Sequence, residues 1–207
     1  MPGKSHLKLV ARMGENRAVP TRRPNSDFRK REHLTPNEVA KLIEAAKSNR
    51  NSLRDSTMIQ VAYRHGLRAS EICDLEWSAI DFTRAELHVS RKKGGKPSTH
   101  PIKADELRAL RRLQREQEPK SPFVFVSEHQ TPLTPDSFNW LVKRAGRKAK
   151  LPFQCHAHML RHACGYKLAG DNRDTRTIQA YLGHADIKHT VRYTELSPKP
   201  FRDFWRD

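Results

Sequence analysis

The chain has 207 residues, and its 40 Lys and Arg residues against 23 Asp and Glu residues give a net charge of +17. This charge favours a polyanionic partner, either a nucleic acid or an anionic membrane surface, although a basic protein without sequence specificity also fits it. No segment approaches the ~18 consecutive apolar residues of a transmembrane helix, and three cysteines without paired spacing (Cys73, Cys155 and Cys164) favour a reducing cytoplasm.

Residues 1–32 are the first predicted unit, a basic arm without a sustained helical or strand period. Pro20 and Pro24 interrupt what little periodicity there is. The arm either follows DNA phosphates and becomes ordered on binding, or it is a solubilising tail, and both interpretations stay open. Residues 33–196 are expected to form one folded domain, and residues 197–207 are expected to form a C-terminal tail.

A capping box opens the folded part of the chain. Thr35 at the N-cap, Pro36 at the first helical position and Glu38 two positions later predict a helix that runs to about residue 47. A second helix is expected from about residue 53 to residue 65, because apolar residues recur there at helical spacing.

The segment after this second helix is expected to begin a third. Gly66 should end the second helix. Ser70 is expected to cap a short helix over about residues 71–75. Arg68 would then lie where a loop meets a helix N-terminus, which is a favourable place for a phosphate.

The middle of the chain predicts a hairpin and a helix. Residues 86–91 alternate as in a strand, and residues 98–102 are its expected partner across a lysine-rich turn. A helix over residues 104–117 should follow. Residues 123–126 are expected to be a short buried strand or an extended segment.

The C-terminal half is expected to be helical. Thr134 and Pro135 repeat the N-cap signal and predict a helix to about residue 147. Further helices are expected at residues 158–169 and 176–182, and a last one from near residue 186 carries Tyr193. The predicted class is mainly α with one small antiparallel β-sheet, an α+β fold.

Cations, histidines and a tyrosine in separate segments together suggest chemistry on a phosphodiester. The guanidinium groups of Arg68 and Arg161 can each bind nonbridging phosphate oxygens and stay charged at neutral pH. The phenol of Tyr193 needs a base or an electropositive pocket, which His158 or the nearby cations can provide. Taken singly, however, such residues are more often surface cations or a packing tyrosine.

A metal site is a weaker interpretation of the histidines. His158 and His162 are four residues apart, but the Glu of a zinc-protease motif is absent between them. We therefore expect no metal and no other cofactor. Cys155, His156 and His162 are interpreted as structural neighbours of the site.

Five short motifs carry a resemblance to a known family: Gly66-Leu67-Arg68-Ala69-Ser70-Glu71, Lys93, His158-Met159-Leu160-Arg161-His162, Leu182-Gly183-His184 and Tyr193-Thr194. Over residues 33–196 the chain resembles the catalytic domain of tyrosine recombinases of the phage integrase family. It is most similar to the small recombinases that invert the fimbrial promoter switch of bacteria.

The resemblance implies a role for each side chain at the phosphate. Arg68 and Arg161 would clamp the scissile phosphate, and His184 would donate to the same oxygens. Glu71 fits a supporting position.

The same resemblance implies the covalent chemistry. Tyr193 would be the nucleophile that forms a 3′-phosphotyrosyl link, so that rejoining needs neither metal nor ATP. Lys93 would protonate the leaving 5′ oxygen, and His158 would assist proton transfer.

The resemblance also implies partners and a setting. The substrate would be double-stranded DNA in the cytoplasm, at the nucleoid, and recombination would be inversion or integration and excision. Monomers would assemble as a homotetramer on synapsed DNA. Most integrases carry a separate DNA-binding domain before the catalytic part, where this chain has only residues 1–32, so DNA-bending accessory proteins are expected.

The tail and the function each leave alternatives open. Phe201, Phe204 and Trp205 lie on one helical face that either docks on a neighbouring protomer or on the chain's own core. The alternatives to a recombinase are a DNA-binding regulator without catalysis and a topoisomerase-like enzyme that relaxes DNA.

Overall fold

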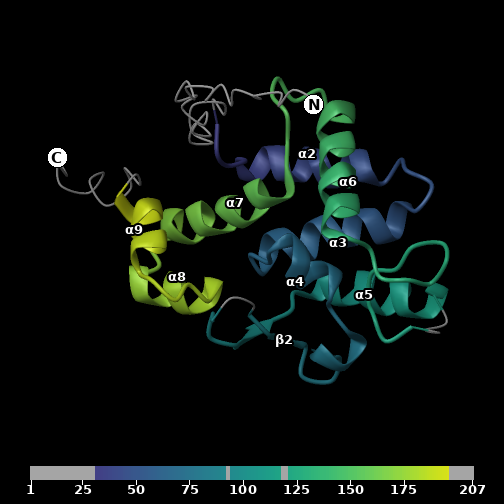
Figure 1. The fold of residues 1–207 in the computed structure, drawn as a ribbon, viewed down its shortest axis with the longest axis horizontal. Helices are drawn as coiled ribbons and strands as arrows, with labels where there is room; N and C mark the ends of the chain where they lie inside the picture. Colours follow the sequence, from purple (N-terminus) through teal and green to yellow (C-terminus); the bar gives the residue numbers. More distant parts are fainter. Residues whose placement is uncertain (1–30, 92–93, 118–120, 196–207) are drawn as a thin grey trace, which may run out of the picture. The chain divides into compact units, whose positions relative to one another are not determined.

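The computed structural model describes residues 31–91, 94–117 and 121–195 (Figure 1). Lys93, residues 1–30 of the predicted arm and the whole predicted tail, with Phe201, Phe204 and Trp205, lie outside the described residues.

The described residues form a mainly helical fold with one small antiparallel sheet, as the sequence predicts (Figure 1). None of the described helices is both long and apolar enough to cross a membrane. The elements in chain order are α2 (Pro36–Ala46), α3 (Ser52–Arg64), α4 (Ala69–Cys73), the 3-10 helix η1 (Trp77–Ala79), β1 (Ile80–Asp81), β2 (Glu86–Val89), β3 (Ser98–Pro101), α5 (Ala104–Gln117), α6 (Pro135–Lys148), α7 (Ala157–Gly170), α8 (Thr175–Leu182) and α9 (Lys188–Glu195).

The two threonine–proline helix starts are confirmed. Thr35 Oγ1 accepts a hydrogen bond from the backbone N–H of Glu38 at 3.3 Å, and the Glu38 carboxylate accepts one from the Thr35 N–H at 2.8 Å. Thr134 caps α6 in the same way, because its Oγ1 accepts from the N–H of Ser137 at 3.1 Å. Local capping chemistry therefore places both helices.

The predicted cap of α4 is wrong. The helix begins at Ala69 rather than Glu71, and its N-cap is Arg68 rather than Ser70. The Glu71 carboxylate accepts the Arg68 N–H at 2.9 Å and so closes the helix N-terminus itself. Gly66, with a φ of +57°, ends α3 just before this start, so the turn between the two helices is short.

The predicted hairpin is present and gains a third strand. The strand order is β1-β2-β3, and all pairs are antiparallel. The sequence missed β1 because two residues are too few for an alternating pattern. Residues 123–126 are mostly buried and make only isolated bridges, which agrees with the extended segment that was predicted.

The buried hydrophobic residues of the described part of the chain form two clusters. The larger one takes residues from α2 to α7, while the smaller one contains only Cys164, Ala169, Ile178, Leu182 and Tyr193 as buried members. α8 and α9 lie together at one end of α7 (Figure 1). The helix that carries Tyr193 is therefore packed on the smaller cluster.

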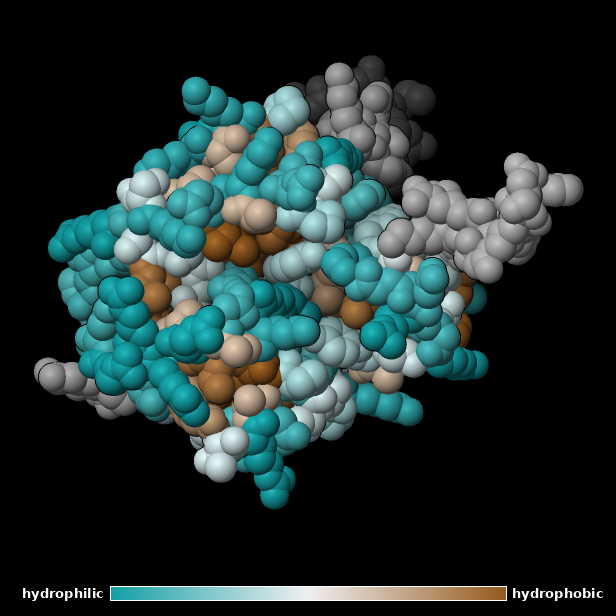
Figure 2. Space-filling view, turned by 180° about the vertical axis from the view of Figure 1, so that it is seen from behind, coloured by the Kyte–Doolittle hydropathy of each residue, from teal (hydrophilic) through white to brown (hydrophobic). Residues whose placement is uncertain are grey.

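The described surface is mostly hydrophilic. On the face in Figure 2, hydrophobic residues show mainly in recesses between hydrophilic ones. Trp140 is the only large hydrophobic side chain among the described residues that is exposed, at 54%, and the guanidinium of Arg144 lies 4.8 Å from its ring centroid. A broad apolar docking face is therefore not a feature of these residues.

Candidate active site

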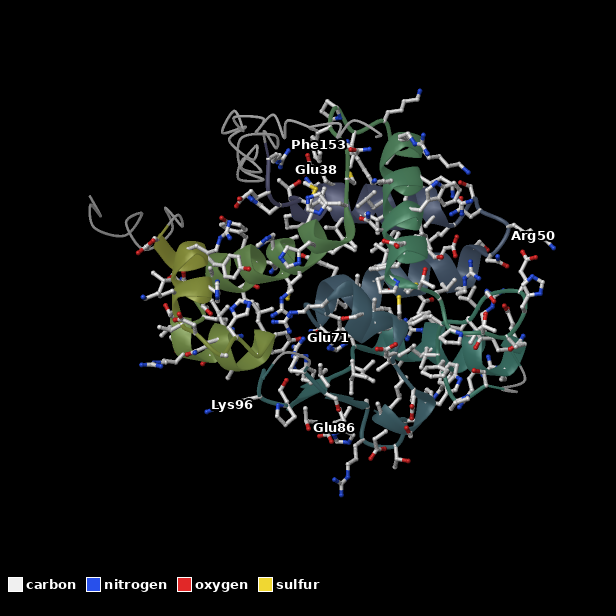
Figure 3. All side chains as sticks on the ribbon, viewed as in Figure 1. Glu38, Arg50, Glu71, Glu86, Lys96 and Phe153 are labelled. Atoms are coloured by element: carbon white, nitrogen blue, oxygen red, sulfur yellow. The ribbon has the colours of Figure 1, made fainter. Side chains whose placement is uncertain are left out.

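A buried carboxylate gathers three arginines from separate elements. Glu71, on α4, is 6% exposed and is labelled in Figure 3. Its Oε1 accepts from Arg68 Nη1 at 2.6 Å, and its Oε2 accepts from Arg91 Nη1 at 3.0 Å. Arg161 Nη1 lies 3.8 Å from the same Oε2. We refer to Arg68, Glu71, Arg91 and Arg161 as the Glu71 cluster.

The charges of the Glu71 cluster keep its carboxylate ionised. Burial would raise the pKa of Glu71, but the hydrogen bonds from Arg68 and the charges of Arg91 and Arg161 hold it below its usual range. One carboxylate faces three guanidinium groups, so the cluster carries an excess of positive charge. Such an excess favours an anionic ligand.

Arg161, on α7, is the most enclosed of these arginines apart from Arg91. It is 1% exposed, and its Nη1 and Nη2 donate to the carbonyl oxygens of Gly66 at 2.5 Å and Leu182 at 2.7 Å. Burial, with the charges of Arg68 and Arg91, lowers its pKa to about 10. The group therefore remains charged at neutral pH and ties the end of α3 to the end of α8.

Arg68 is the arginine of the cluster with an accessible side chain. Its side chain is 25% exposed, while that of Glu71 beside it is 1% exposed. Because the backbone and the side chain of Arg68 both bond Glu71, the guanidinium is fixed at the start of α4. It can meet a phosphate from solvent without giving up its position.

His184 follows the left-handed Gly183 that ends α8. Its Nδ1 lies 2.8 Å from Thr190 Oγ1, so the loop is fastened to α9. Burial, with the charges of Arg161 and Arg68, lowers the pKa of His184 to about 3. A neutral imidazole therefore lies beside the Glu71 cluster at pH 7.

Tyr193, on α9, is buried and bonds a histidine. It is 1% exposed, and its hydroxyl lies 3.0 Å from His162 Nδ1. Burial raises the pKa of Tyr193 to about 12, although the charges of Arg161 and Arg192 act in the opposite direction. The ring lies against α7, because a Cβ on Gly165 would come within 2.6 Å of it. The phenol is thus protonated and held against α7.

The histidine next to the phenol is His162 rather than His158. His158 is exposed and meets His162 edge to face, with 4.4 Å between ring centroids. Burial, with the charge of His158, lowers the pKa of His162 to about 3, so it is neutral and can accept a hydrogen bond from the phenol. From the sequence we interpret His162 only as a structural neighbour, although its place directly after Arg161 is a signal.

The structure brings only part of the expected set together. Arg68 and Arg161 belong to the Glu71 cluster and His184 lies beside it, while the hydroxyl of Tyr193 is turned to His162. Lys93 lies outside the described residues, and Lys96, labelled in Figure 3, extends outward from the same hairpin. Among the residues that the structure describes, no group of three His, Cys, Asp or Glu side chains is arranged to hold a metal.

Comparisons with known proteins agree on one family. Residues 32–199 match the model of the phage integrase family. The type 1 fimbriae regulatory protein FimE of Escherichia coli K12 is 38% identical over 181 residues, which are 85% of this chain and 91% of FimE. The tyrosine recombinase XerA of Pyrococcus horikoshii is 33% identical over 173 residues, which are 82% of this chain and 59% of XerA.

A solved structure has the same fold. The XerH site-specific recombinase, crystallised with its palindromic difH substrate after cleavage, superposes with a TM-score of 0.72 at 22% identity. The match covers 83% of this chain and 52% of XerH.

Proposed function

The chain belongs to the phage integrase family and is a tyrosine-type site-specific DNA recombinase, and we propose that it cleaves and rejoins DNA through Tyr193. The observation that carries this assignment is the Glu71 cluster, with His184 beside it and Tyr193 within the electrostatic range of Arg161. These groups are what in-line attack by a phenol on a phosphodiester requires.

Two arginines of the Glu71 cluster would bind the scissile phosphate. Arg68 and Arg161 bind its nonbridging oxygens and neutralise the charge that repels an incoming phenolate. His184 donates an N–H to the same group of oxygens. Glu71 keeps the arginines in place before DNA arrives, so little reorganisation remains at the moment of reaction.

The covalent step exchanges one phosphodiester for another. The phenolic oxygen of Tyr193 forms a bond to phosphorus, the bond from phosphorus to the 5′ oxygen breaks, and the 5′ oxygen leaves as a hydroxyl with a proton from Lys93. The phenolic proton passes to His158, which lies next to His162, the hydrogen-bond partner of the hydroxyl in the free protein. Rejoining is the reverse reaction with a 5′ hydroxyl of another strand, which conserves the bond energy.

Cleavage also needs a change at α9. In the described conformation the hydroxyl of Tyr193 is bonded to His162, and burial keeps its pKa near 12. We propose that DNA binding turns this hydroxyl toward the phosphate held by Arg68 and Arg161. The smaller hydrophobic cluster under α9 makes such a shift less costly than one in the main core.

The subgroup and the assembly are also proposals. Similarity to FimE supports DNA inversion, with integration and excision as the other outcomes of the same chemistry. Residues 33–196 would be the catalytic domain, residues 1–32 a DNA-binding arm, and residues 197–207 a tail exchanged within a homotetramer on synapsed DNA. Monomers, helped by DNA-bending proteins, would assemble in the cytoplasm at the nucleoid.

A nicked half-site assay tests the proposed function. On its cognate half-site, the wild-type protein should form a covalent adduct that survives SDS, because the short cleaved strand diffuses away and blocks rejoining. Tyr193→Phe should bind the same DNA and form no adduct. Absence of an adduct with the wild type, or its persistence with Tyr193→Phe, would refute the assignment.

A further inference from the structure

Arg91 is a buried arginine that the proposed chemistry does not use. It follows β2 in phase with Leu87 and Val89, both of which face the core, so its side chain also points inward. The side chain is 0% exposed, and burial lowers the pKa of its guanidinium although Glu71 opposes the change. A buried cation destabilises the fold unless ion pairs and hydrogen bonds compensate for its lost hydration.

The partners of Arg91 come from three elements that build the candidate site. Nη1 donates to Glu71 Oε2 at 3.0 Å and lies 3.4 Å from the Gly66 carbonyl. Nη2 donates to the carbonyls of His65 at 3.2 Å and Tyr181 at 2.5 Å. The guanidinium therefore joins the end of α3, the start of α4 and the end of α8.

Two of these partners also bond a residue of the phosphate site, and the other two, His65 and Tyr181, each precede an acceptor of Arg161. The carbonyl of Gly66 also accepts from Arg161, and Glu71 also holds Arg68. Tyr181 precedes Leu182, whose carbonyl is the second acceptor of Arg161. Arg161, on α7, contacts the end of α3, Glu71 and the end of α8. Arg91 contacts the same three regions from the segment that follows β2.

Two glycines make room for this brace. A Cβ on Gly183 would lie 2.6 Å from Arg91 Cγ, and one on Gly95 would lie 2.6 Å from the Gly183 carbonyl and 2.8 Å from Arg91 Cβ. The stem of Arg91 is therefore enclosed between the returning arm of the hairpin and the residue that precedes His184. Any movement of Arg91 must shift that loop.

Stability alone is a poor reason for this arrangement. The Nε of Arg91 is buried and has no hydrogen-bond partner among the described residues. Hydrogen bonds therefore do not fully compensate for the lost hydration of the guanidinium. Buried ion pairs often contribute less to stability than an apolar residue of the same volume. The contacts of Arg91 are instead with the groups that hold the candidate site together.

We propose that Arg91 is a positioning residue for DNA cleavage, which holds Glu71 and the end of α8 where Arg68, Arg161 and His184 can bind the scissile phosphate. This inference rests on the proposed function and deepens it. Arg91 is not proposed to touch the substrate, because its side chain is wholly enclosed and, unlike that of Arg161, is not among the charges that act on Tyr193. It acts through the Glu71 cluster and the loop before His184.

The test compares Arg91→Met with a matched variant, Arg54→Met. Arg54 is also largely buried, at 15% side-chain exposure, and bonds the buried Asp55 and the Val126 carbonyl. Cleavage of a nicked half-site is followed in single turnovers at saturating DNA and at a temperature where both variants are folded. Arg91→Met should cleave ~100-fold more slowly, as expected for a misplaced phosphate site. Arg54→Met should cleave within about 3-fold of wild type.

A second variant and a second substrate separate the mechanisms. Arg91→Lys keeps the charge but cannot reach both Glu71 and the Tyr181 carbonyl, so it should lose about 10-fold, and it carries the test if Arg91→Met does not fold. On DNA with sulfur at the bridging 5′ position, the leaving group needs no proton. The slow cleavage by Arg91→Met should persist there, because its defect lies at the nonbridging oxygens.

Three results would overturn the inference while wild type still forms its adduct. They are normal cleavage by both Arg91 variants, an equal loss in Arg54→Met, and full recovery of Arg91→Met on the sulfur substrate. The last would mean that Arg91 acts only on protonation of the leaving group. A wild-type protein that forms no adduct would instead refute the proposed function itself, and the inference with it.

Discussion

Two buried carboxylates each hold several basic or polar side chains, and only one lies at the candidate site. Asp55, on α3, is 0% exposed and accepts hydrogen bonds from Asn49 at 2.9 Å, Arg54 at 2.7 Å and Arg144 at 3.1 Å. We call these four residues the Asp55 cluster. The Glu71 cluster has the same kind of centre, with three arginines.

The Asp55 cluster and the Glu71 cluster differ in their net charge and in the side chains that lie beside each carboxylate. Two guanidinium groups face Asp55, and Arg54 continues to the Val126 carbonyl, so this cluster fastens α3 to the segment after α5. Three guanidinium groups face Glu71; the charges of all three act on His184, and that of Arg161 acts on Tyr193. A buried carboxylate with arginines is thus not in itself a functional site; the excess of charge beside reactive groups makes it a candidate.

Arginine substitutions should give the largest contrast between the clusters. Arg161→Met removes a proposed phosphate ligand and should slow adduct formation about 1000-fold at saturating DNA, as for loss of one donor to a developing anion. Arg144→Met should leave the rate within about 3-fold of wild type. Single-turnover cleavage measures both, and similar rates for the two variants would remove the distinction.

Neutral carboxyl replacements should separate activity from stability. Glu71→Gln and Asp55→Asn each neutralise a buried carboxylate that pairs with arginines, so both should lower the free energy of unfolding by about 3 kcal/mol. Only Glu71→Gln should also slow cleavage, by about 10-fold or more. Urea unfolding and cleavage at a temperature where both are folded provide the two readouts, and a catalytic defect in Asp55→Asn would contradict the comparison.

Acid should destabilise the Glu71 side of the molecule. The pKa of His162, like those of His100 and His184, is lowered to about 3, chiefly by burial. Between pH 6.5 and 3 the unfolded chain therefore binds more protons, so stability is full above about pH 6.5 and falls as the pH decreases.

The histidine effect has a measurable size. Each histidine that the fold holds neutral can contribute a slope of up to about 1.4 kcal/mol per pH unit below pH 6.5. His162→Gln should reduce the slope of unfolding free energy against pH, and His129→Gln, at an exposed loop position, should not. Equal slopes for the wild type and His162→Gln would show that His162 is not held neutral by the fold.

A helix cap should give the smallest effect and calibrate the others. Thr35→Ala removes the side-chain acceptor at the start of α2 and should cost about 1 kcal/mol of unfolding free energy. Cleavage of folded protein should be unchanged, since α2 lies in the main core. A cleavage defect here would mean that general loss of stability, rather than the Glu71 cluster, sets the rate.

Local sequence patterns predicted the helices and strands. Contacts between residues of different helices and strands could not be predicted from them. The Thr35 and Thr134 caps were readable because the side chain and its partner are three residues apart. The bond from Arg91 to the Tyr181 carbonyl spans ninety positions, and no local pattern encodes it. An inward position occupied by Arg91, in phase with Leu87 and Val89, was the available signal.

The candidate site was predicted in part for the same reason. Motif resemblance supplied Arg68, Arg161 and His184, which the fold brings together. It did not give the direction of the Tyr193 hydroxyl, because that depends on how α9 packs against α7. The contact with His162 follows from that packing.

The most direct measurement is the identity of the residue that becomes linked to DNA. Wild-type protein is trapped on a nicked half-site and digested, and the peptide that carries the nucleotide is sequenced by mass spectrometry. The chain has four tyrosines, Tyr63, Tyr166, Tyr181 and Tyr193. We expect a 3′-phosphate ester on Tyr193; attachment to another residue, or no attachment on cognate DNA, would contradict the proposed function.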